Sequence, residues 1–215
     1  MKKQVAFFAF VHSGQICMNI KRIYVHENIY DKFLATFVAT TKQFPGGDGP
    51  DAFFSPIQNK MQYEKLQNFY SQIGTQGWKT ALGGETSASK EGGETKGFYM
   101  PATIIDNPPE NSSIVTDEPF GPIVPVLKWS DEEDVIKRAN GSKLGLGASV
   151  WSQDVKRAQR MAEQLEAGSI WVNTHFELAP SVPYGGHKES GLGMDWGIVG
   201  LQGWCNPQAY WVKHR

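Results

Sequence analysis

Apolar residues recur along the chain at two different spacings, which predict strands and helices in turn. Short β-branched or aromatic runs predict strands at residues 22–26, 78–82, 98–105, 123–129, 148–151 and 169–173. Between these runs, apolar residues at helical spacing predict helices that begin at Asn28, Gln58, Ser130 and Asp154. Strands that alternate with helices are typical of a mostly parallel sheet covered on both faces. The pattern therefore predicts an α/β fold.

Three stretches stand outside this alternation. The apolar residues 5–11 form a short run that leads directly into a cysteine-containing turn, and we interpret them as a segment packed in the core. Residues 83–97 are rich in Gly, Ser, Thr, Glu and Lys, which predicts an exposed loop. Residues 208–213, near the C-terminus, have the composition of an edge strand.

Length and composition fit a single domain over residues 1–215. The 215 residues are 40% hydrophobic, which is enough to bury a core. A formal net charge of −1 gives no reason to expect nucleic acid or a membrane as partner, and no apolar run is long enough to span one. Cys17 and Cys205 lie too far apart in sequence for a disulfide framework, so we expect a cytoplasmic protein. The histidines have no spacing typical of a metal site.

Residues 10–17, Phe-Val-His-Ser-Gly-Gln-Ile-Cys, are the leading candidate for chemistry. A glycine turn at Gly14 precedes Cys17, and we expect this thiol at or near the start of a helix. Backbone N–H groups and the helix dipole would favour a thiolate there, and a thiolate attacks carbonyl carbon. From the residues alone, an inert buried thiol is the equally weighted alternative.

Four segments together resemble the aldehyde dehydrogenase superfamily. Residues 14–17 (Gly-Gln-Ile-Cys), followed by 22–26 (Arg-Ile-Tyr-Val-His), resemble its active-site cysteine segment. Residues 118–122 (Glu-Pro-Phe-Gly-Pro), 169–173 (Ser-Ile-Trp-Val-Asn) and 183–193 (Pro-Tyr-Gly-Gly-His-Lys-Glu-Ser-Gly-Leu-Gly) are similar to its later signatures, in the same order. The resemblance implies the Rossmann-like catalytic domain of that family. It covers only the family's C-terminal part, so we expect a truncated version of that fold.

The resemblance also implies roles for individual residues. In the family a cysteine thiolate attacks an aldehyde, a hydride passes to NAD(P), and the resulting thioester is hydrolysed. Cys17 corresponds to the nucleophile, Glu118 to the residue that holds the nicotinamide ribose, and Phe120 to its neighbour against the nicotinamide. Without the resemblance, Glu118 would be read as a surface acid before a turn.

Several later residues correspond to the family's aldehyde pocket. Leu178 and Tyr184 fall where the family lines that pocket, although core packing is the alternative for both. Asn173 is expected to order the backbone near the site, and His175 lies on the pocket loop as a candidate to move a proton. These side chains indicate an apolar or aromatic carbonyl compound as substrate.

The sequence departs from the family in two respects. The family's glutamate base, its oxyanion-hole asparagine and most of its NAD(P) crevice lie upstream of the cysteine, outside this sequence. We therefore expect that this chain alone does not bind NAD(P) productively and is not an efficient dehydrogenase. His12 stands where the family usually has asparagine, so it is a candidate base or imidazolium partner for Cys17. A histidine that is simply folded into a turn is the alternative.

Three hypotheses of function follow. The first is the catalytic part of an aldehyde dehydrogenase, and retention of Glu118 favours it. The second is a cofactor-independent biosynthetic enzyme that hydrolyses, condenses or cyclises a carbonyl or thioester compound, and His12 favours it. The third is a non-catalytic binding or assembly protein.

The resemblance implies that one face of this domain meets the cofactor-binding domain in the family, and that face would need to be covered here. We therefore expect a homo-oligomer or a partner chain over that face. Residues 206–215 would serve as the oligomerisation strand, since a strand near this end pairs between subunits in the family.

Overall fold

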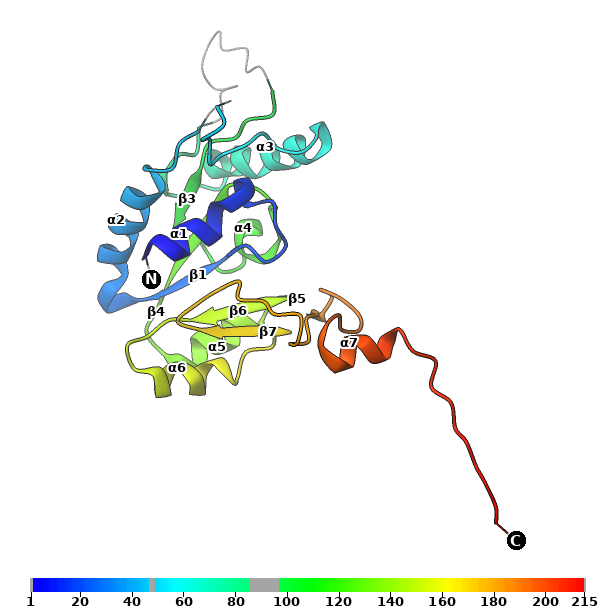
Figure 1. The fold of residues 1–215 in the computed structure, drawn as a ribbon. Coiled ribbons are helices and arrows are strands. Elements are labelled where there is room, and N and C mark those ends of the chain that lie inside the picture. Colours follow the sequence, from blue (N-terminus) through cyan, green and yellow to red (C-terminus); the bar gives the residue numbers. More distant parts are fainter. Residues whose placement is uncertain (1, 47–48, 86–96, 215) are drawn as a thin grey trace.

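The computed structural model describes residues 2–46, 49–85 and 97–214, and a four-stranded sheet lies at its centre (Figure 1). The strand order is β1 (Ile23–His26), β4 (Ile123–Trp129), β3 (Thr103–Asp106) and β2 (Thr80–Leu82). β1 and β3 run parallel to the central β4, and β2 pairs with β3 in the antiparallel sense. The sheet is therefore mostly parallel, which confirms the predicted fold class.

One face of this sheet is covered by α1 (Lys2–Phe10) and α2 (Tyr30–Thr41), which lie next to each other in Figure 1. The apolar run predicted to pack in the core forms α1. Phe10 of α1 and Phe37 of α2 are almost fully buried, and their ring centroids lie 6.0 Å apart. Both rings belong to the same cluster as Val124 of the central strand.

The opposite face is covered by α3 (Lys60–Thr75) and α4 (Ser113–Thr116). Leu66 of α3 is completely buried in this second core. Successive side chains of a strand point to opposite faces. Ile104 therefore packs under α1 and α2, whereas Ile105 packs under α3 and α4. Helices on both faces of the sheet confirm the remaining part of the fold prediction.

A second group of strands follows in the chain and lies below the first sheet in Figure 1. β6 pairs with β7 in parallel, and β5 pairs with β8 in the antiparallel sense. The elements after β4 are α5 (Glu132–Asn140), β5 (Leu144–Gly145), β6 (Gly147–Val150), α6 (Val155–Ala162), β7 (Ser169–Val172), β8 (His187–Lys188) and α7 (Gly197–Gly203). Among the residues described, no helix is long and apolar enough to cross a bilayer.

The starts of the helices follow their capping side chains. Asn59, Asp131 and Asp154 each accept a hydrogen bond from the backbone N–H three residues further on, which is the usual N-cap. The predicted cap at Asn28 is wrong. A short 3₁₀ helix, η2 (Glu27–Ile29), precedes α2, and Nδ1 of His26 accepts the Asn28 N–H.

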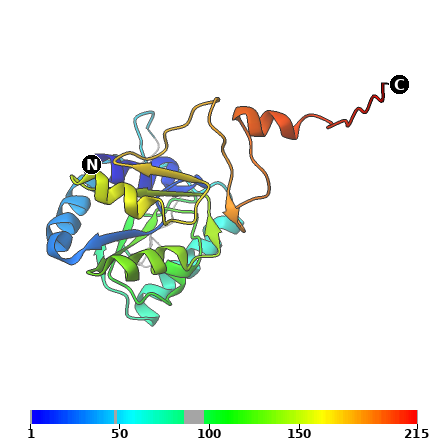
Figure 2. The same cartoon turned by 90° about the horizontal axis from the view of Figure 1, so that it is seen from below.

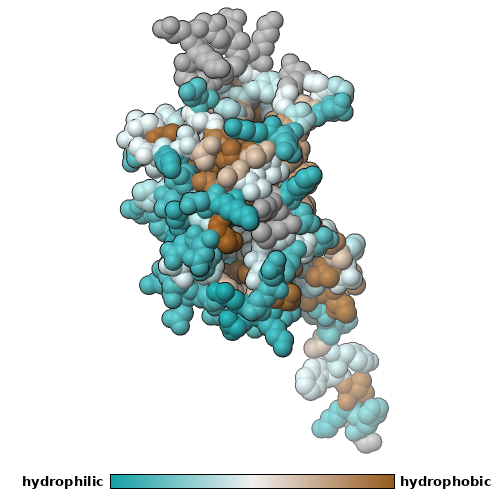
Figure 3. All heavy atoms as spheres, turned by 90° about the vertical axis from the view of Figure 1, so that its left-hand side faces the viewer, coloured by the Kyte–Doolittle hydropathy of each residue, from teal (hydrophilic) through white to brown (hydrophobic). Residues whose placement is uncertain are grey.

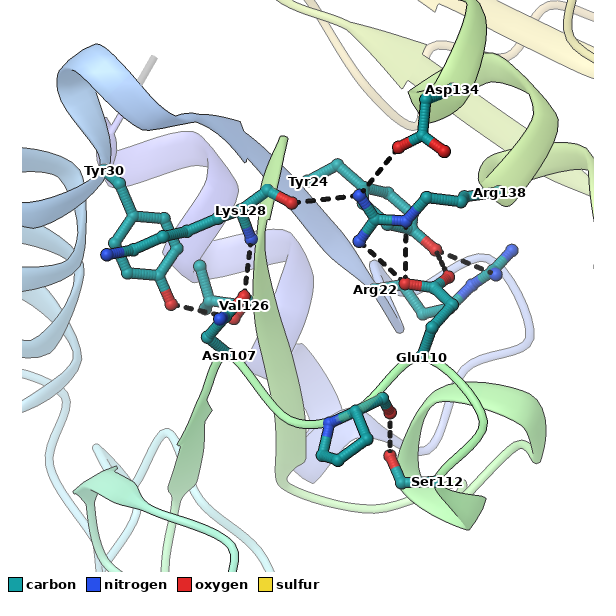
Figure 4. Close-up of polar contacts among 11 residues, drawn as sticks. Arg22, Tyr24, Tyr30, Asn107, Glu110, Ser112, Val126, Lys128, Asp134 and Arg138 are labelled. Carbon is teal, nitrogen blue, oxygen red and sulfur yellow. Dashed lines mark hydrogen bonds and ion pairs between the residues drawn. The ribbon is translucent and has the colours of Figure 1, made fainter. Parts of the chain in front are cut away.

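A polar network fixes α5 and β1 to the loop after β3 (Figure 4). Arg138 donates from Nε and Nη2 to Oε2 of Glu110, at 2.9 and 2.7 Å, and from Nη1 to the Lys128 carbonyl at 3.0 Å. The Tyr24 hydroxyl also donates to Glu110, and Arg22 donates to that hydroxyl at 3.4 Å. Hydrogen bonds between charged groups are stronger than those between neutral groups, so this network holds α5 against β1 and the loop after β3.

The C-terminal residues extend away from the body (Figures 1 and 2). Residues 208–213, predicted as a strand, have no strand partner within the described chain, so their pairing with a second chain stays a prediction. Hydrophobic side chains of this part lie on the surface (Figure 3), including Ile198, Leu201, Trp204 and Trp211. Residues 86–96 of the predicted loop lie outside the described residues.

Replacing Leu66 with alanine should lower the free energy of unfolding by about 2–5 kcal/mol, because the lost side chain leaves a cavity between α3 and the sheet. Urea denaturation followed by circular dichroism measures this change. Leu192→Ala is the matched control, since Leu192 is 102% exposed, and it should change the same free energy by less than about 0.5 kcal/mol. Similar losses for both variants would contradict the placement of α3.

Candidate functional site

Cys17 lies in a surface turn between the 3₁₀ helix η1 (Val11–Gly14) and β1. The turn is closed by the Asn19 N–H, which donates to the Ile16 carbonyl at 3.0 Å. The prediction that Cys17 begins a helix is wrong, because the chain turns here and passes directly into β1. The thiol is nevertheless exposed, so it is not the buried cysteine of the alternative interpretation.

The backbone before Cys17 adopts an unusual conformation. His12, Ser13 and Gly14 have φ values of 55°, 54° and 72°, so three successive residues are left-handed. Side chains disfavour this region, and such residues persist only where their surroundings hold them. A Cβ atom on Gly14 would lie 2.2 Å from the carbonyl oxygen of Gly121, so glycine is required there. The turn before Cys17 thus rests directly on the main chain of the segment 118–122.

Side chains on both sides of Gly14 hold the turn in place. The Ser13 hydroxyl donates to the Ser55 carbonyl and accepts from the Ser55 N–H, both at 2.8 Å. Oε1 of Gln15 accepts the Gln58 N–H at 2.9 Å, and its Nε2 donates to the Pro56 carbonyl at 3.3 Å. These bonds keep the strained backbone in a single conformation.

The segment that contains Glu118 and Phe120 is positioned by α3. Lys65 donates to the Glu118 carbonyl at 2.9 Å, and Gln62 donates to the Pro119 and Phe120 carbonyls at 2.7 and 3.1 Å. Phe120 has a φ of 55°, a further left-handed residue. The Glu118 side chain is one-third exposed, at 33%, so its carboxylate faces solvent in part. The structure therefore brings Glu118 and Phe120 beside the Cys17 turn.

Lys21 lies between these two segments, and no local sequence pattern marks it. Its Nζ donates to the Ile16 and Gly14 carbonyls at 2.8 and 3.1 Å. The same atom lies 3.7 Å from the Glu118 carboxylate and 4.8 Å from the centre of the Phe120 ring. Burial lowers the pKa of Lys21 to about 8, although the negative charges of Glu118 and Cys17 act in the opposite direction.

Tyr184, predicted to line the substrate pocket, is a neighbour of Cys17. Burial raises the pKa of Tyr184 to about 12, and the charge of Cys17 and hydrogen bonding to it add to this effect. The phenol therefore keeps its proton at neutral pH. Its main chain is fixed by two hydrogen bonds with Asp195, at 2.8 and 2.7 Å, and its ring centroid lies 5.4 Å from that of Trp196.

His175 is buried and contacts the main chain of the Cys17 turn. Its Nε2 lies 2.8 Å from the Met18 carbonyl, and because a carbonyl only accepts, Nε2 carries the hydrogen. Nδ1 has no hydrogen-bond partner within the described residues, and burial lowers the pKa of His175 against the effect of the Met18 carbonyl. The ring packs on Phe8 and Trp171, with centroids 5.4 and 4.9 Å away. His175 is thus a neutral support of the turn, and no hydrogen bond joins it to Cys17.

A cavity of about 400 Å³ adjoins Tyr184. Its lining is largely apolar and includes Ile170, Trp171, Leu178, Val182, Tyr184 and Trp196. Tyr184 therefore connects this cavity with the Cys17 thiol. Leu178 lies in the cavity wall with its side chain partly exposed.

Two predicted site residues are not brought to the thiol. Asn173 orders the backbone, as expected, but at the turn after β6: its amide accepts the Ser152 N–H and donates to the Ser152 carbonyl, both at 2.8 Å. His12 is exposed, and no hydrogen bond, ion pair or ring contact joins it to Cys17. The structure therefore shows no contact between His12 and Cys17 that would support His12 as a replacement base. Across the described ranges, no three His, Cys, Asp or Glu side chains are placed to hold a metal ion.

Comparison with known proteins gives a single family. The sequence profile of the aldehyde dehydrogenase family matches residues 1–210. An aldehyde dehydrogenase of a Fusarium species is 35% identical over 201 residues, which are 94% of this chain and 42% of that protein. Betaine aldehyde dehydrogenase of Brucella anthropi is 33% identical over 206 residues, which are 95% of this chain and 42% of that protein.

Solved structures agree with the sequence comparisons. The crystal structure of Staphylococcus aureus betaine aldehyde dehydrogenase in complex with NAD⁺ superposes with a TM-score of 0.86 at 30% identity. The match covers 94% of this chain and 40% of that one. The chain thus spans about two fifths of the length of the relatives that it matches.

Gly14→Ala should lower the free energy of unfolding by about 1–3 kcal/mol more than Gly77→Ala does, as measured by urea denaturation. Both glycines have a positive φ, 72° and 66°, so both alanines suffer the same backbone strain. Only at Gly14 would the added methyl group meet the main chain of Gly121, since nothing lies within 4 Å of a Cβ at Gly77. Equal losses would show that the close approach of the two segments does not constrain the site.

Proposed function

The chain belongs to the aldehyde dehydrogenase family, and we propose that Cys17 is the nucleophile through which it acts on aldehydes. One observation carries the proposal: Cys17 is an exposed thiol on a turn whose backbone is fixed from both sides, with the Lys21 ammonium beside it. A thiolate is the nucleophilic form of cysteine, and a positive charge nearby favours that form. A fixed turn also holds the sulfur ready for attack, which reduces the entropic cost of the reaction.

In the proposed step the thiolate sulfur of Cys17 donates an electron pair to the carbonyl carbon. A C–S bond forms, and the π electrons of the C=O bond move to the oxygen. A hydrogen-bond donor near that oxygen would stabilise its new negative charge. The Tyr184 hydroxyl keeps its proton at neutral pH and lies beside the sulfur, so we assign it this role.

Glu118 and Phe120 have the chemistry needed to hold the nicotinamide ribose of NAD(P). The Glu118 carboxylate has about four acceptor sites and is partly exposed, and its 3.7 Å separation from Lys21 is longer than a direct hydrogen bond. Two ribose hydroxyls can therefore donate to it, and the Phe120 ring can exclude water alongside. NAD(P) would supply a hydride acceptor when bound.

The largely apolar cavity beside Tyr184 supports an apolar or aromatic aldehyde as the substrate. Indole, aliphatic and phenol side chains line most of it. A volume of about 400 Å³ suits a small molecule of the size of a substituted benzaldehyde.

Benzaldehyde should slow the alkylation of Cys17 by iodoacetamide several-fold, because addition to the carbonyl consumes the thiolate. Cys205 is an internal control, since both cysteines are exposed in the same chain. Peptide mass spectrometry after timed quenching measures both rates, and the rate at Cys205 should not change. Equal protection of both cysteines, or none at Cys17, would contradict the proposal.

The same preparation tests the redox step. We expect no NAD(P)H absorbance from this chain alone with NAD(P) and an aldehyde, because its sequence holds no Gly-x-Gly-x-x-Gly turn for a dinucleotide. Formation of NAD(P)H by the wild type and not by Cys17→Ser would overturn this expectation and leave the role of Cys17 intact.

We also propose that a second copy of the chain or a partner chain covers α7 and the C-terminal residues. The side chains of Trp204, Tyr210 and Trp211 are 87%, 86% and 91% exposed, and such apolar surface is typical of an interface. Sedimentation velocity at micromolar concentration should show a species larger than the 23.9 kDa monomer. Truncation after residue 204 should shift it towards the monomer, and a monodisperse monomer of the full chain would refute self-association.

A further inference from the structure

We propose that Lys21 is a positioning residue of this site, whose ammonium group ties the Cys17 turn to Glu118 and attracts the Cys17 thiolate. The inference rests on the proposed role of Cys17 as the nucleophile. Lys21 is four residues beyond Cys17, in the stretch that leads into β1. It does not line the cavity, and it takes no part in the hydrogen bonds of Ser13 with Ser55 or of Gln15 with Gln58.

The ammonium of Lys21 has three hydrogens to donate and no acceptor. Two of them go to the Ile16 and Gly14 carbonyls, at 2.8 and 3.1 Å, so one hydrogen remains. The negative groups that favour the ammonium form of Lys21 are the Glu118 carboxylate, 3.7 Å away, and the Cys17 thiolate. A single side chain thereby connects the turn before the thiol with the proposed ribose-binding carboxylate.

The Lys21 side chain is only 19% exposed. An ion pair in such a place is less screened by water and salt than a surface pair. The charged groups that act on Lys21 are Glu118 and Cys17, which favour its ammonium form, and Lys65 of α3, which opposes it. The Phe120 ring lies 4.8 Å below Nζ and presents its face to the cation.

The charge of Lys21 depends on pH within an accessible range. Because burial lowers the pKa of Lys21 to about 8, the side chain is mostly charged at pH 7 and mostly neutral above pH 9. A neutral amine attracts neither a thiolate nor a carboxylate. The effect of Lys21 on Cys17 should therefore be present at neutral pH and disappear in alkaline solution.

The neighbouring basic residues do not share this position. Arg22 donates to the Ala139 carbonyl at 3.0 Å and belongs to the network of Figure 4. Lys65 is exposed and binds the main-chain carbonyl of Glu118, not its carboxylate. Lys60, at the start of the same helix, has a side chain that is 77% exposed and lies 3.7 Å from Glu64. Lys60→Met thus removes one positive charge from α3 and leaves the bonds of Lys21 and Lys65 in place, which makes it the matched control.

The test measures the rate of Cys17 alkylation by iodoacetamide from pH 6 to pH 10, in a Cys205→Ser background, by intact mass spectrometry. At pH 7, Lys21→Met should react about three- to tenfold more slowly than the background protein, because an attractive charge is lost. Lys60→Met should stay within about twofold of the background protein, as an exposed charge is well screened.

The pH profile and two further variants separate the effect of the Lys21 charge from that of its hydrogen bonds to the Ile16 and Gly14 carbonyls. The rate ratio of the background protein to Lys21→Met should fall towards one above pH 9, where Lys21 is neutral. Lys21→Arg keeps a positive charge throughout this range, so its rate at pH 7 should stay closer to that of the background protein than to that of Lys21→Met. Lys21→Gln retains an amide donor for the Ile16 carbonyl and should resemble Lys21→Met if the charge is decisive.

Four outcomes would overturn the proposal. The first is an unchanged rate for Lys21→Met at pH 7, and the second is an equal loss for Lys60→Met. The third is a ratio that does not vary with pH, and the fourth is an undiminished rate for Lys21→Gln, which also covers the case in which Lys21→Met fails to fold. Alkylation needs neither an aldehyde nor NAD(P). A chain without aldehyde chemistry would therefore refute the proposed function, and the effect of Lys21 on the thiol would still be measurable.

Discussion

The site depends on a contact between two stretches of main chain. Gly14 approaches Gly121 so closely that no other residue fits at Gly14, and Gly121 in turn lies on the side chain of Leu66, which a Cβ atom would meet at 2.4 Å. Leu66 belongs to the core on one face of the sheet, so the position of the Cys17 turn is set by the packing of α3. The hydrogen bonds of Ser13 and Gln15, the left-handed backbone and the ammonium of Lys21 all act on a turn that this contact has already placed.

The chemical groups come from three separate parts of the chain. The thiol follows α1, the Glu118 segment follows α4, and Tyr184 and His175 follow β7. Each part brings one property: an exposed thiol, a carboxylate beside an aromatic ring, and a phenol next to an apolar cavity. Lys21 and His175 connect these parts by bonding to main-chain carbonyls of the Cys17 turn, so the geometry does not depend on long, flexible side-chain pairs.

Much of the fold was predictable because its signals are local. β4 follows from the apolar residues 123–127, and α5 and α6 follow from capping side chains, with the α5 cap at Asp131, one residue after the predicted start, and the α6 cap at Asp154. The helix start predicted at Asn28 failed because the cap lies two residues earlier: the His26 ring accepts the Asn28 N–H, and Asn28 lies inside the 3₁₀ helix η2. The predicted helix at Cys17 failed because the helix precedes the thiol instead of following it. Resemblance to the family singled out Cys17, Glu118, Phe120 and Tyr184, and their roles stay predictions. Lys21 was missed because its partner Glu118 is distant in sequence.

Several of the groups that hold the Cys17 turn in place come much later in the chain. Ser55, Gln58, Gly121 and His175 all follow the thiol, and the bond from His175 to Met18 spans 157 residues. Contacts of such wide separation form late in folding, because the loop they close costs entropy before any contact repays it. Without these contacts, residues 12–14 would lose partners that hold their left-handed conformation. The position of the Cys17 thiol thus depends on residues spread over most of the chain, so a change far from it in sequence can still displace it.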